Sequence, residues 1–264
     1  MSSFGEFYVF SDGALRPLND TLSETLTVAD SFLIQEGRVR QINRHFERFE
    51  KSIASPEVKA VLPEFFSAVL AELPRSGSWF PRLEYREHQP ESERLVLRLR
   101  EAPERTATLS LWSSDEPDPR KQAGVKGPDL SVCQRLRRAA NLHGADEAVI
   151  LSQDGFIADG ALSSIMWWES DTLCAPDNTT DWLPSITRQL VFELAREAGY
   201  QILEKRAKPS DLENCEVWSL SSLQGIRYVT AWGDLKLGES RHASSFRKRL
   251  ALLSSSIDNV SWAA

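Results

Sequence analysis

The chain has 264 residues, of which 41% are hydrophobic and 26% charged, and these shares are ordinary for a globular protein. They argue against wholesale disorder and against a fibrous repeat, and the length suits one large domain or two modest ones. The formal net charge of −7, from 31 basic and 38 acidic residues, argues against a general nucleic-acid or anionic-membrane surface.

We expect a cytoplasmic protein, because the sequence shows no recognisable targeting signal and no cysteine pattern of a secreted protein. No apolar run of about 18 residues could span a bilayer, and the start MSSFGEFYVFSDG lacks the charged and apolar regions of a signal peptide. The cysteines are odd in number and widely spaced, without a CxxC pair: Cys133, Cys174 and Cys215. We therefore expect no disulfide framework, no metal site and no membrane or nucleic-acid partner.

The first part of the chain mixes strands and helices. FYVFSDGALRPL predicts a hairpin, because Asp12-Gly13 permits the positive φ angles of a tight turn. Apolar residues recur at the spacing of one helical face at Ile42, Phe46, Phe49 and Ile53. A second helix is expected over residues 58–73, with a kink or a boundary at Pro63. Strand candidates follow in FPRLEYREH, RLVLRLRE and TATLSLW.

A change of composition then suggests a domain boundary. The stretch SSDEPDPRKQAG has no apolar period, carries two prolines and mixes both charges, as is typical of a linker. We expect an N-terminal α/β domain over residues 1–114, a linker over 115–124 and a C-terminal domain over 125–264.

The second part of the chain also mixes both element types. LSVCQRLRRAANLHG and DWLPSITRQLVFELAREAG predict amphipathic helices that end at Gly144 and Gly199. Strands are expected in EAVILSQ, FIAD, SSIMWW, QILEKR, EVWSLSSL and IRYVTAWG. The fold class is therefore α+β or α/β.

Common catalytic motifs are missing from the sequence. It has no Walker loop, no Gly-x-Gly-x-x-Gly and no Gly-x-Ser-x-Gly elbow. The four histidines are scattered, at His45, His88, His143 and His242. Spacing alone predicts for each of them a solvated or packing role.

Three segments, in this order and spacing, resemble a known family. HFERF, residues 45–49, is similar to a His-x-x-Arg-Leu helix; AGVK, GADEAVILSQDGFIADGALSSIMWW and LPSITRQLVFELAREAG form a long central block; VWSLSSLQGIRYVTAWG is similar to a late strand-turn-strand. Together they resemble the class IV (fold type IV) pyridoxal-phosphate enzymes, and look closest to aminodeoxychorismate lyase. The resemblance implies a smaller N-terminal α/β domain, a larger C-terminal domain with a barrel-like sheet and helices, and pyridoxal 5′-phosphate (PLP) as cofactor.

The resemblance implies that Lys126 is the catalytic lysine. In the lyases this lysine follows Ala-Gly-Ile and precedes an Asp-Glu-Ala strand start; here AGV leads to Lys126 and DEA begins at Asp146. A lysine that forms a Schiff base and then shuttles a proton needs a lowered pKa, which burial and nearby positive charge supply.

The cofactor phosphate is expected at the start of the second predicted helix of the C-terminal half. Ile186 and Thr187 open this helix, and free N–H groups together with the positive end of the helix dipole favour an anion there. The resemblance adds Arg48 from the His-x-x-Arg helix and Ser222 from the late turn, as further phosphate-binding residues.

Three positions depart from the family pattern. Asp159 stands where the family places a glutamate against the pyridine nitrogen, and Ser164 stands where an asparagine is usual. Aspartate keeps the charge but is one methylene shorter, so the backbone must come closer or a water must bridge. The resemblance implies that the aromatic-rich N-terminal loop of the family is shortened here to TLSETLTVADSFLI, in which Ser31 falls at the position of a threonine hydroxyl near the substrate Cα.

Three functions remain open at this level. The favoured one is a PLP-dependent lyase of folate biosynthesis that acts through a Lys126 Schiff base on aminodeoxychorismate and releases pyruvate and 4-aminobenzoate. The alternatives are a class IV aminotransferase of branched-chain or D-amino-acid type, and a catalytically altered fold-type-IV scaffold. In each enzymatic case the substrate is a small amine, and the resemblance implies a homodimer.

Overall fold

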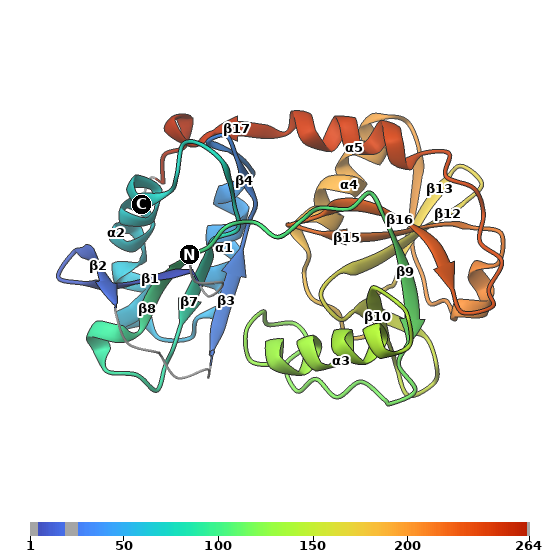
Figure 1. The fold of residues 1–264 in the computed structure, drawn as a ribbon, viewed down its shortest axis with the longest axis horizontal. Coiled ribbons are helices and arrows are strands. Elements are labelled where there is room, and N and C mark those ends of the chain that lie inside the picture. The colour runs from blue at the N-terminus through green and yellow to red at the C-terminus, as the bar shows by residue number, and fades with distance from the viewer. Residues whose placement is uncertain (1–4, 19–25, 263–264) are drawn as a thin grey trace. The chain divides into compact units, whose positions relative to one another are not determined.

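The computed structural model describes residues 5–18 and 26–262 of the chain. The chain divides into two compact units, which are described separately below (Figure 1). The first unit comprises residues 1–104, 125–128 and 253–264, and the second comprises residues 105–124 and 129–252. We also expected two domains joined by a linker over residues 115–124, and this division stays a prediction.

The first unit contains two sheets. Its larger sheet is antiparallel throughout, and its order is β2 (Ala14–Leu18), β1 (Glu6–Ser11), β8 (Leu95–Leu99), β7 (Arg82–Tyr85) and β3 (Val28–Ser31). The smaller sheet has the order β17 (Ser254–Ser256), β5 (Arg38–Arg40), β4 (Ile34–Gln35) and β6 (Ser78–Trp79). The predicted hairpin is confirmed, since Asp12 and Gly13 have φ angles of 50° and 74° between β1 and β2.

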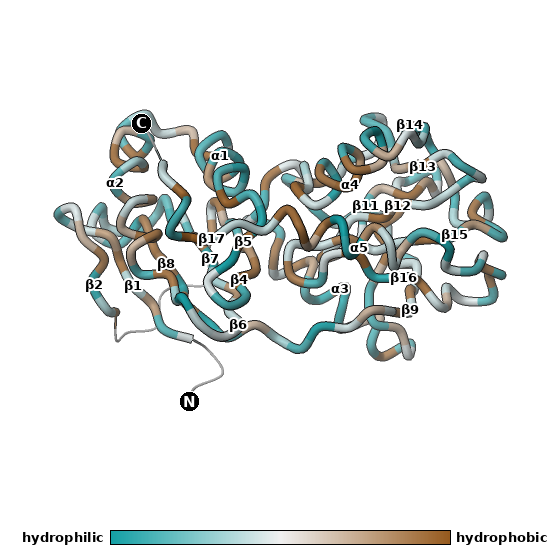
Figure 2. The backbone as a smooth tube through the Cα atoms, turned by 90° about the horizontal axis from the view of Figure 1, so that it is seen from above, coloured by the Kyte–Doolittle hydropathy of each residue, from teal (hydrophilic) through white to brown (hydrophobic). Residues whose placement is uncertain are grey.

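Two helices complete the first unit, α1 (Ile42–Ser52) and α2 (Pro56–Glu72). The predicted apolar face of α1 is buried, with Phe46 and Phe49 fully inaccessible in a core that also contains Phe65 and Phe66 of α2. In Figure 2, brown, apolar stretches alternate with teal, hydrophilic ones along both helices. Of the kink or boundary expected at Pro63, the boundary is wrong, because α2 continues through it, whereas the kink stays a prediction.

The second unit is built on one mixed sheet. Its strand order is β11 (Ile157–Gly160), β10 (Glu147–Leu151), β9 (Thr108–Ser113), β16 (Gly225–Trp232), β15 (Glu216–Ser221), β12 (Ser164–Glu169), β13 (Thr172–Ala175) and β14 (Gln201–Glu204). The pairs β10–β9, β16–β9 and β13–β14 are parallel and the others antiparallel.

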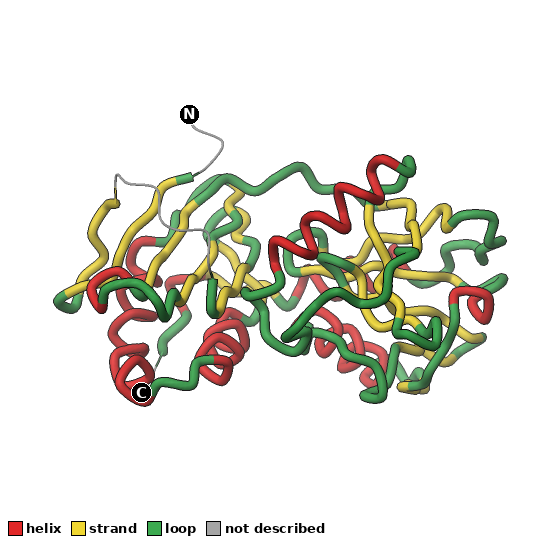
Figure 3. The backbone as a smooth tube through the Cα atoms, turned by 90° about the horizontal axis from the view of Figure 1, so that it is seen from below, coloured by secondary structure: helices red, strands yellow, loops and turns green. Residues whose placement is uncertain are grey.

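Helices cover this sheet. They are α3 (Leu130–Leu142), α4 (Ile186–Glu197) and α5 (Ala243–Leu252), drawn in red in Figure 3. β10 is buried on both faces: Ala148 and Ile150 join the cluster of α3, whereas Val149 joins a cluster with Ile157 and Trp167. Short 3-10 helices occur at Glu91–Glu93, Pro209–Leu212 and Ile257–Asn259.

No helix in the described part of the chain is both long and apolar enough to cross a membrane. The shortened N-terminal loop expected before Ser31 falls partly on residues 19–25, which lie outside the described residues.

Candidate functional site

Lys126 lies in a segment that packs with the first unit. The Ala29 N–H donates a hydrogen bond of 2.6 Å to the carbonyl oxygen of Lys126, and Val125 packs against the hydrophobic core of this unit. Gly127 has a φ of +142°, and a Cβ atom there would lie only 2.9 Å from the backbone nitrogen of Ala29. The backbone of the segment therefore lies directly against β3, while the Lys126 side chain is half-buried.

Ser31 lies on the same strand, two residues beyond Ala29. Side chains two residues apart on a strand point to the same face, so Ala29 and Ser31 share one face of the sheet. Ser31 is buried and stands opposite Arg82 in the antiparallel register of β3 and β7. Two residues expected at the site, Lys126 and Ser31, thus belong to one unit and are both tied to β3.

The other face of β3 carries a buried ion pair. The Arg48 guanidinium donates to both oxygens of Asp30, from Nε at 2.7 Å and from Nη2 at 2.8 Å. The His45 Nδ1 lies 2.7 Å from Oδ1 of Asp30, so His45 is neither solvated nor a simple packing residue. Asp30 therefore orients Arg48, the residue expected at the cofactor phosphate.

The charges in this cluster explain its protonation. Burial alone would raise the pKa of Asp30, but Arg48 and His45 together hold this pKa well below its usual range. Burial lowers the pKa of His45, against the pull of Asp30. The low pKa means that Asp30 carries its charge at neutral pH, and a carboxylate can only accept, so the Nδ1–H of His45 donates to it.

In the second unit, α4 presents the helix start that the sequence predicts. Ser185 is the N-cap, and its Oγ accepts a hydrogen bond of 3.2 Å from the Arg188 N–H. Ile186 and Thr187 are both buried in the first turn, where helix geometry leaves their N–H groups without acceptors inside the helix. The helix dipole adds a partial positive charge, so this turn is suited to an anion.

Arg188 fixes the start of α4 in place. Its guanidinium donates to the Pro176 carbonyl oxygen at 2.6 Å, pairs with Glu204, and lies 3.9 Å from the centre of the Trp182 ring. Arg188 is buried, and burial lowers its pKa while Glu204 and Asp159 oppose that shift.

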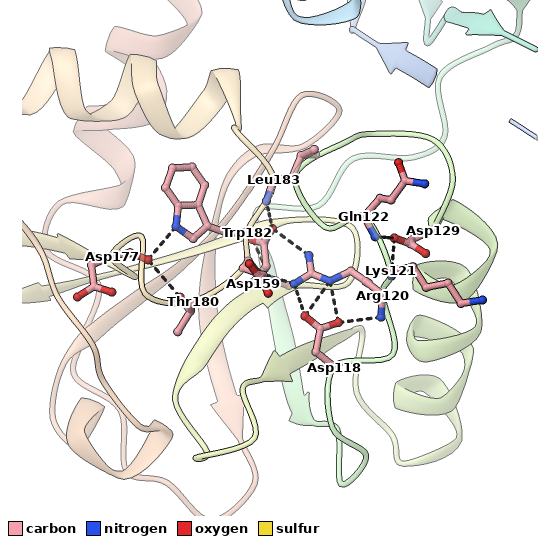
Figure 4. Close-up of polar contacts among 12 residues, drawn as sticks. Asp118, Arg120, Lys121, Gln122, Asp129, Asp159, Asp177, Thr180, Trp182 and Leu183 are labelled. Atoms are coloured by element: carbon pink, nitrogen blue, oxygen red, sulfur yellow. Dashed lines mark hydrogen bonds and ion pairs between the residues drawn. The ribbon is translucent and has the colours of Figure 1, made fainter. Parts of the chain in front are cut away.

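Asp159 lies on β11 with only 4% of its surface exposed. Its Oδ2 accepts the Leu183 N–H at 3.1 Å, and its Oδ1 accepts the Gly160 N–H at the same distance. Arg120 approaches Oδ2 to 3.7 Å (Figure 4). Burial raises the pKa of Asp159 to about 6, although Arg120 and the Leu183 N–H both favour the ionised form.

The serines near Asp159 and in the late turn differ in their environment. A side-chain hydrogen bond from Ser164 stabilises the ionised form of Asp159. The buried Ser163 Oγ has no hydrogen-bond partner among the described residues. Ser222 is half-buried in the turn between β15 and β16, where the neighbouring Ser221 Oγ accepts the Gln224 N–H at 3.1 Å.

The sequence also matches a family model, described as amino-transferase class IV, over residues 27–232. The chain belongs to the class IV aminotransferase family. This match covers most of both units, and it confirms the family expected from the three sequence segments.

Curated relatives of this class IV chain have aminotransferase names. The branched-chain-amino-acid aminotransferase of Escherichia coli K12 is 26% identical over 136 residues, which are 51% of this chain and 44% of that protein. The probable branched-chain-amino-acid aminotransferase of Rickettsia felis is 27% identical over 103 residues, 39% of this chain and 35% of that protein. The match thus spans less than half the length of these relatives.

Solved structures share the fold of this class IV chain. An aminotransferase from Brucella abortus bound to PLP has a TM-score of 0.77 at 18% identity, covering 94% of this chain and 98% of that one. The Escherichia coli branched-chain amino acid aminotransferase has a TM-score of 0.75 at 15% identity, covering 94% of each chain. At such identities the likeness shows the fold, and the expected fold-type-IV architecture is confirmed.

The structure places the expected site residues of this class IV chain in both units. Lys126, Ser31 and Arg48 belong to the first unit. Ile186, Thr187, Asp159 and Ser222 belong to the second. Sequence reasoning missed Asp30 and Arg120, the charged partners of Arg48 and Asp159. The one signal for Asp30 was a carboxylate inside an otherwise apolar strand, next to Ser31.

Proposed function

We propose that this protein is a PLP-dependent aminotransferase that moves the amino group of a small amino acid to a keto acid. The observation that carries the proposal is the class IV aminotransferase match over residues 27–232. The relatives with branched-chain names favour an amino acid as amine donor.

The chemistry of the donor groups supports PLP as the cofactor. The first turn of α4, with Ile186 and Thr187, suits a phosphate dianion, and the carboxylate of Asp159 suits a protonated pyridine nitrogen. The buried Ser163 Oγ next to this region lacks a partner among the described residues, and such atoms normally have one. When bound, PLP supplies an electron sink for negative charge at the substrate Cα.

Each of the expected site residues has a separate role in the proposed reaction. Lys126 would hold the cofactor covalently through its side-chain amine. Once the incoming substrate amine displaces this link, the freed Lys126 amine would take a proton from the substrate Cα and return it elsewhere on the reacting group. Arg48, oriented by Asp30, and Ser222 contribute to phosphate binding. The Ser31 hydroxyl positions the Lys126 amine or the substrate.

The lyase reaction is a second candidate. It is supported by the AGVK sequence around Lys126 and by the interval from this lysine to Asp146-Glu147-Ala148. A lyase releases pyruvate from aminodeoxychorismate and needs no second amino acceptor. The curated relatives favour the aminotransferase over it.

The first experiment tests the covalent link. Purified protein is mixed with PLP, reduced with borohydride, digested and analysed by mass spectrometry. We expect a yellow protein before reduction and, after it, added cofactor mass on the peptide that contains Lys126. Lys126→Ala should lose both signals, whereas the exposed Lys121→Ala should keep them. A wild-type protein that takes up no PLP would favour the altered-scaffold alternative.

The second experiment separates the two reactions. The PLP-loaded protein is incubated with single amino acids, and conversion of the cofactor to its pyridoxamine form is followed by absorbance. An aminotransferase converts the cofactor with at least one amino acid, and a keto acid then reverses this conversion. A lyase instead forms pyruvate and 4-aminobenzoate from aminodeoxychorismate. The homodimer that we also propose is measured by light scattering.

A further inference from the structure

The residues between β9 and α3 are folded onto the second unit. We call residues 114–122 the strap. Its start is fixed by the Ser114 N–H, which donates to the Val149 carbonyl oxygen at 2.9 Å. Its end is fixed by Asp129, whose Oδ2 accepts the N–H groups of Lys121 and Gln122 at 3.0 and 2.7 Å. The strap is thus held at both ends, and Figure 4 shows how it carries Arg120 towards Asp159.

Arg120 is the buried centre of the strap, with a side chain that is 4% exposed. Its Nε and Nη2 bind the two oxygens of Asp118 at 2.9 and 2.7 Å, and Nη2 also donates to the Asp181 carbonyl oxygen at 2.6 Å. Its remaining terminal nitrogen, Nη1, lies 3.7 Å from Oδ2 of Asp159. These contacts within the protein fix the plane of the Arg120 guanidinium.

We propose that Arg120 is a positioning residue for Asp159, which it keeps ionised and oriented so that the carboxylate can bind the ring nitrogen of the cofactor. This inference rests on the proposed function. The strap then does more than connect two parts of the chain, because it contributes to the cofactor site.

The charges of Asp159 and its neighbours support this role. Asp118, Arg120 and Asp159 together carry a net charge of −1, and a protonated ring nitrogen would bring the set to neutrality. Arg188, the other cation near Asp159, is already paired with Glu204. Since unbalanced buried charge is costly, the three residues are arranged for one further cation.

The hydrogen bonds of the Asp159 carboxylate also support this role. Arg120 and the Leu183 N–H both act on Oδ2, whereas Oδ1 accepts the adjacent Gly160 N–H, and the Ser164 side chain adds one hydrogen bond to the carboxylate. A carboxylate oxygen can accept more than one hydrogen bond, so Oδ1 keeps capacity for another donor. An aspartate is short and needs such fixing to present a defined oxygen. A neutral Asp159 could not hold a ring nitrogen in its protonated form.

The first test uses the cofactor-free protein and measures Asp159 directly. The carboxyl carbon of Asp159, assigned with Asp159→Asn, is titrated by ¹³C NMR. Arg120→Met should raise the pKa of Asp159 by about one to three units, the usual effect of losing a nearby opposite charge. Asp118→Asn should lower it, because Arg120 loses its compensating carboxylate, and Arg120→Lys should stay near the wild type. The groups that also face Asp159, namely Arg188, Ser164 and the Leu183 N–H, are unchanged in all variants.

The second test measures PLP affinity by equilibrium dialysis between pH 5 and 9. Arg120→Met should weaken binding at least tenfold at neutral pH and move the pH profile together with the Asp159 titration, and Arg120→Lys should rescue part of the loss. The exposed Arg135→Met is the matched control and should bind as the wild type does.

The outcomes separate this inference from the proposed function. An Asp159 pKa that Arg120→Met and Asp118→Asn leave unchanged would overturn the coupling. A moved pKa with unchanged PLP affinity would overturn the role toward the cofactor. If the wild type itself bound no PLP, the proposed function and this role would both fail, while the NMR titration would still report the coupling of Arg120 to Asp159. Asp118→Asn gives a second result if Arg120→Met does not fold.

Discussion

Asp30 and Arg48 form a two-point ion pair between β3 and α1, with contacts of 2.7 and 2.8 Å. Asp30 is buried and also binds His45, so the pair connects the strand that carries Ser31 to the helix that carries the expected phosphate ligand. The pair therefore contributes both to the stability of the first unit and to the orientation of Arg48.

Asp30→Asn should destabilise the protein by about 3–5 kcal/mol, because it leaves the mostly buried Arg48 without its counter-ion. Urea denaturation measures the free energy of unfolding. The matched control is Glu47→Gln, which breaks an exposed pair with Lys51 and should change stability by less than about 0.5 kcal/mol. Equal effects of the two substitutions would contradict the role given to Asp30.

The lowered pKa of Asp30 also sets a pH dependence. A carboxyl whose pKa is lower in the folded state stabilises the fold above its unfolded pKa of about 4, and this stabilisation is lost as the pH falls. Asp30→Asn should therefore cost less at acidic pH than at neutral pH. Denaturation at both pH values checks the sign.

Glu147 should show the opposite pH dependence. This residue on β10 is 2% exposed, and burial raises its pKa to about 7, although Arg227 and Arg137 oppose the shift. A carboxyl whose pKa is raised in the folded state stabilises the fold below the pKa of the unfolded state. This stabilisation is lost as the pH rises towards the folded-state pKa of about 7. Compared with Glu147→Gln, the wild type should lose on the order of 2–3 kcal/mol of stability between pH 5 and pH 8. A constant difference over this range would show that Glu147 titrates normally.

Much of the fold could be predicted from local sequence. Helix α4 combines a serine N-cap with an apolar stripe, and both features act within a few residues of each other. The same holds for the hairpin at Asp12-Gly13, where the turn requires positive φ angles. Local signals of this kind do not depend on the rest of the chain.

Helix α5 shows where local signals were insufficient. It buries only three residues, Ala243, Phe246 and Leu250, so its apolar pattern is short. Its start is stabilised from a distance: the carboxylate of Glu216 accepts the N–H groups of Arg241, His242 and Ala243. A cap that comes from a residue about 25 positions earlier cannot be recognised from spacing.

The charged partners of the site were missed for a similar reason. Asp30 and Arg120 are polar residues that a sequence pattern assigns to solvent, and both are buried because a long-range partner offsets their charge. Pro63 shows the reverse case, in which α2 continues because Leu62, Phe65 and Phe66 beside the proline are fully buried. Tertiary packing decides each of these positions.

Gly127→Ala should displace the segment that carries Lys126. The φ of +142° is unfavourable for alanine, and the new Cβ would lie 2.9 Å from the backbone of β3, which cannot move as a flexible side chain can. We expect a stability loss of about 1–3 kcal/mol and a clear fall in PLP loading, measured by denaturation and absorbance. Gly124→Ala is the control, since its Cβ would meet no atom within 4 Å. If Gly127→Ala loaded PLP as well as Gly124→Ala, the close approach to β3 would not matter for the lysine.

Ser31→Ala should lower turnover while leaving PLP loading intact. The Ser31 hydroxyl is buried on the face of β3 that also carries Ala29, the backbone partner of Lys126, so its proposed contact is with the reacting groups and not with the phosphate. Loss of one hydrogen bond of this kind corresponds to about a tenfold fall in kcat/KM. Ser31→Thr should restore most of the rate, because threonine keeps the hydroxyl and suits a strand. Ser67→Ala, at an exposed helix position, controls for a general effect of removing a serine. Full activity of Ser31→Ala would mean that the hydroxyl does not contribute. Equal impairment of both Ser31 variants would mean that the position is sensitive only to side-chain size.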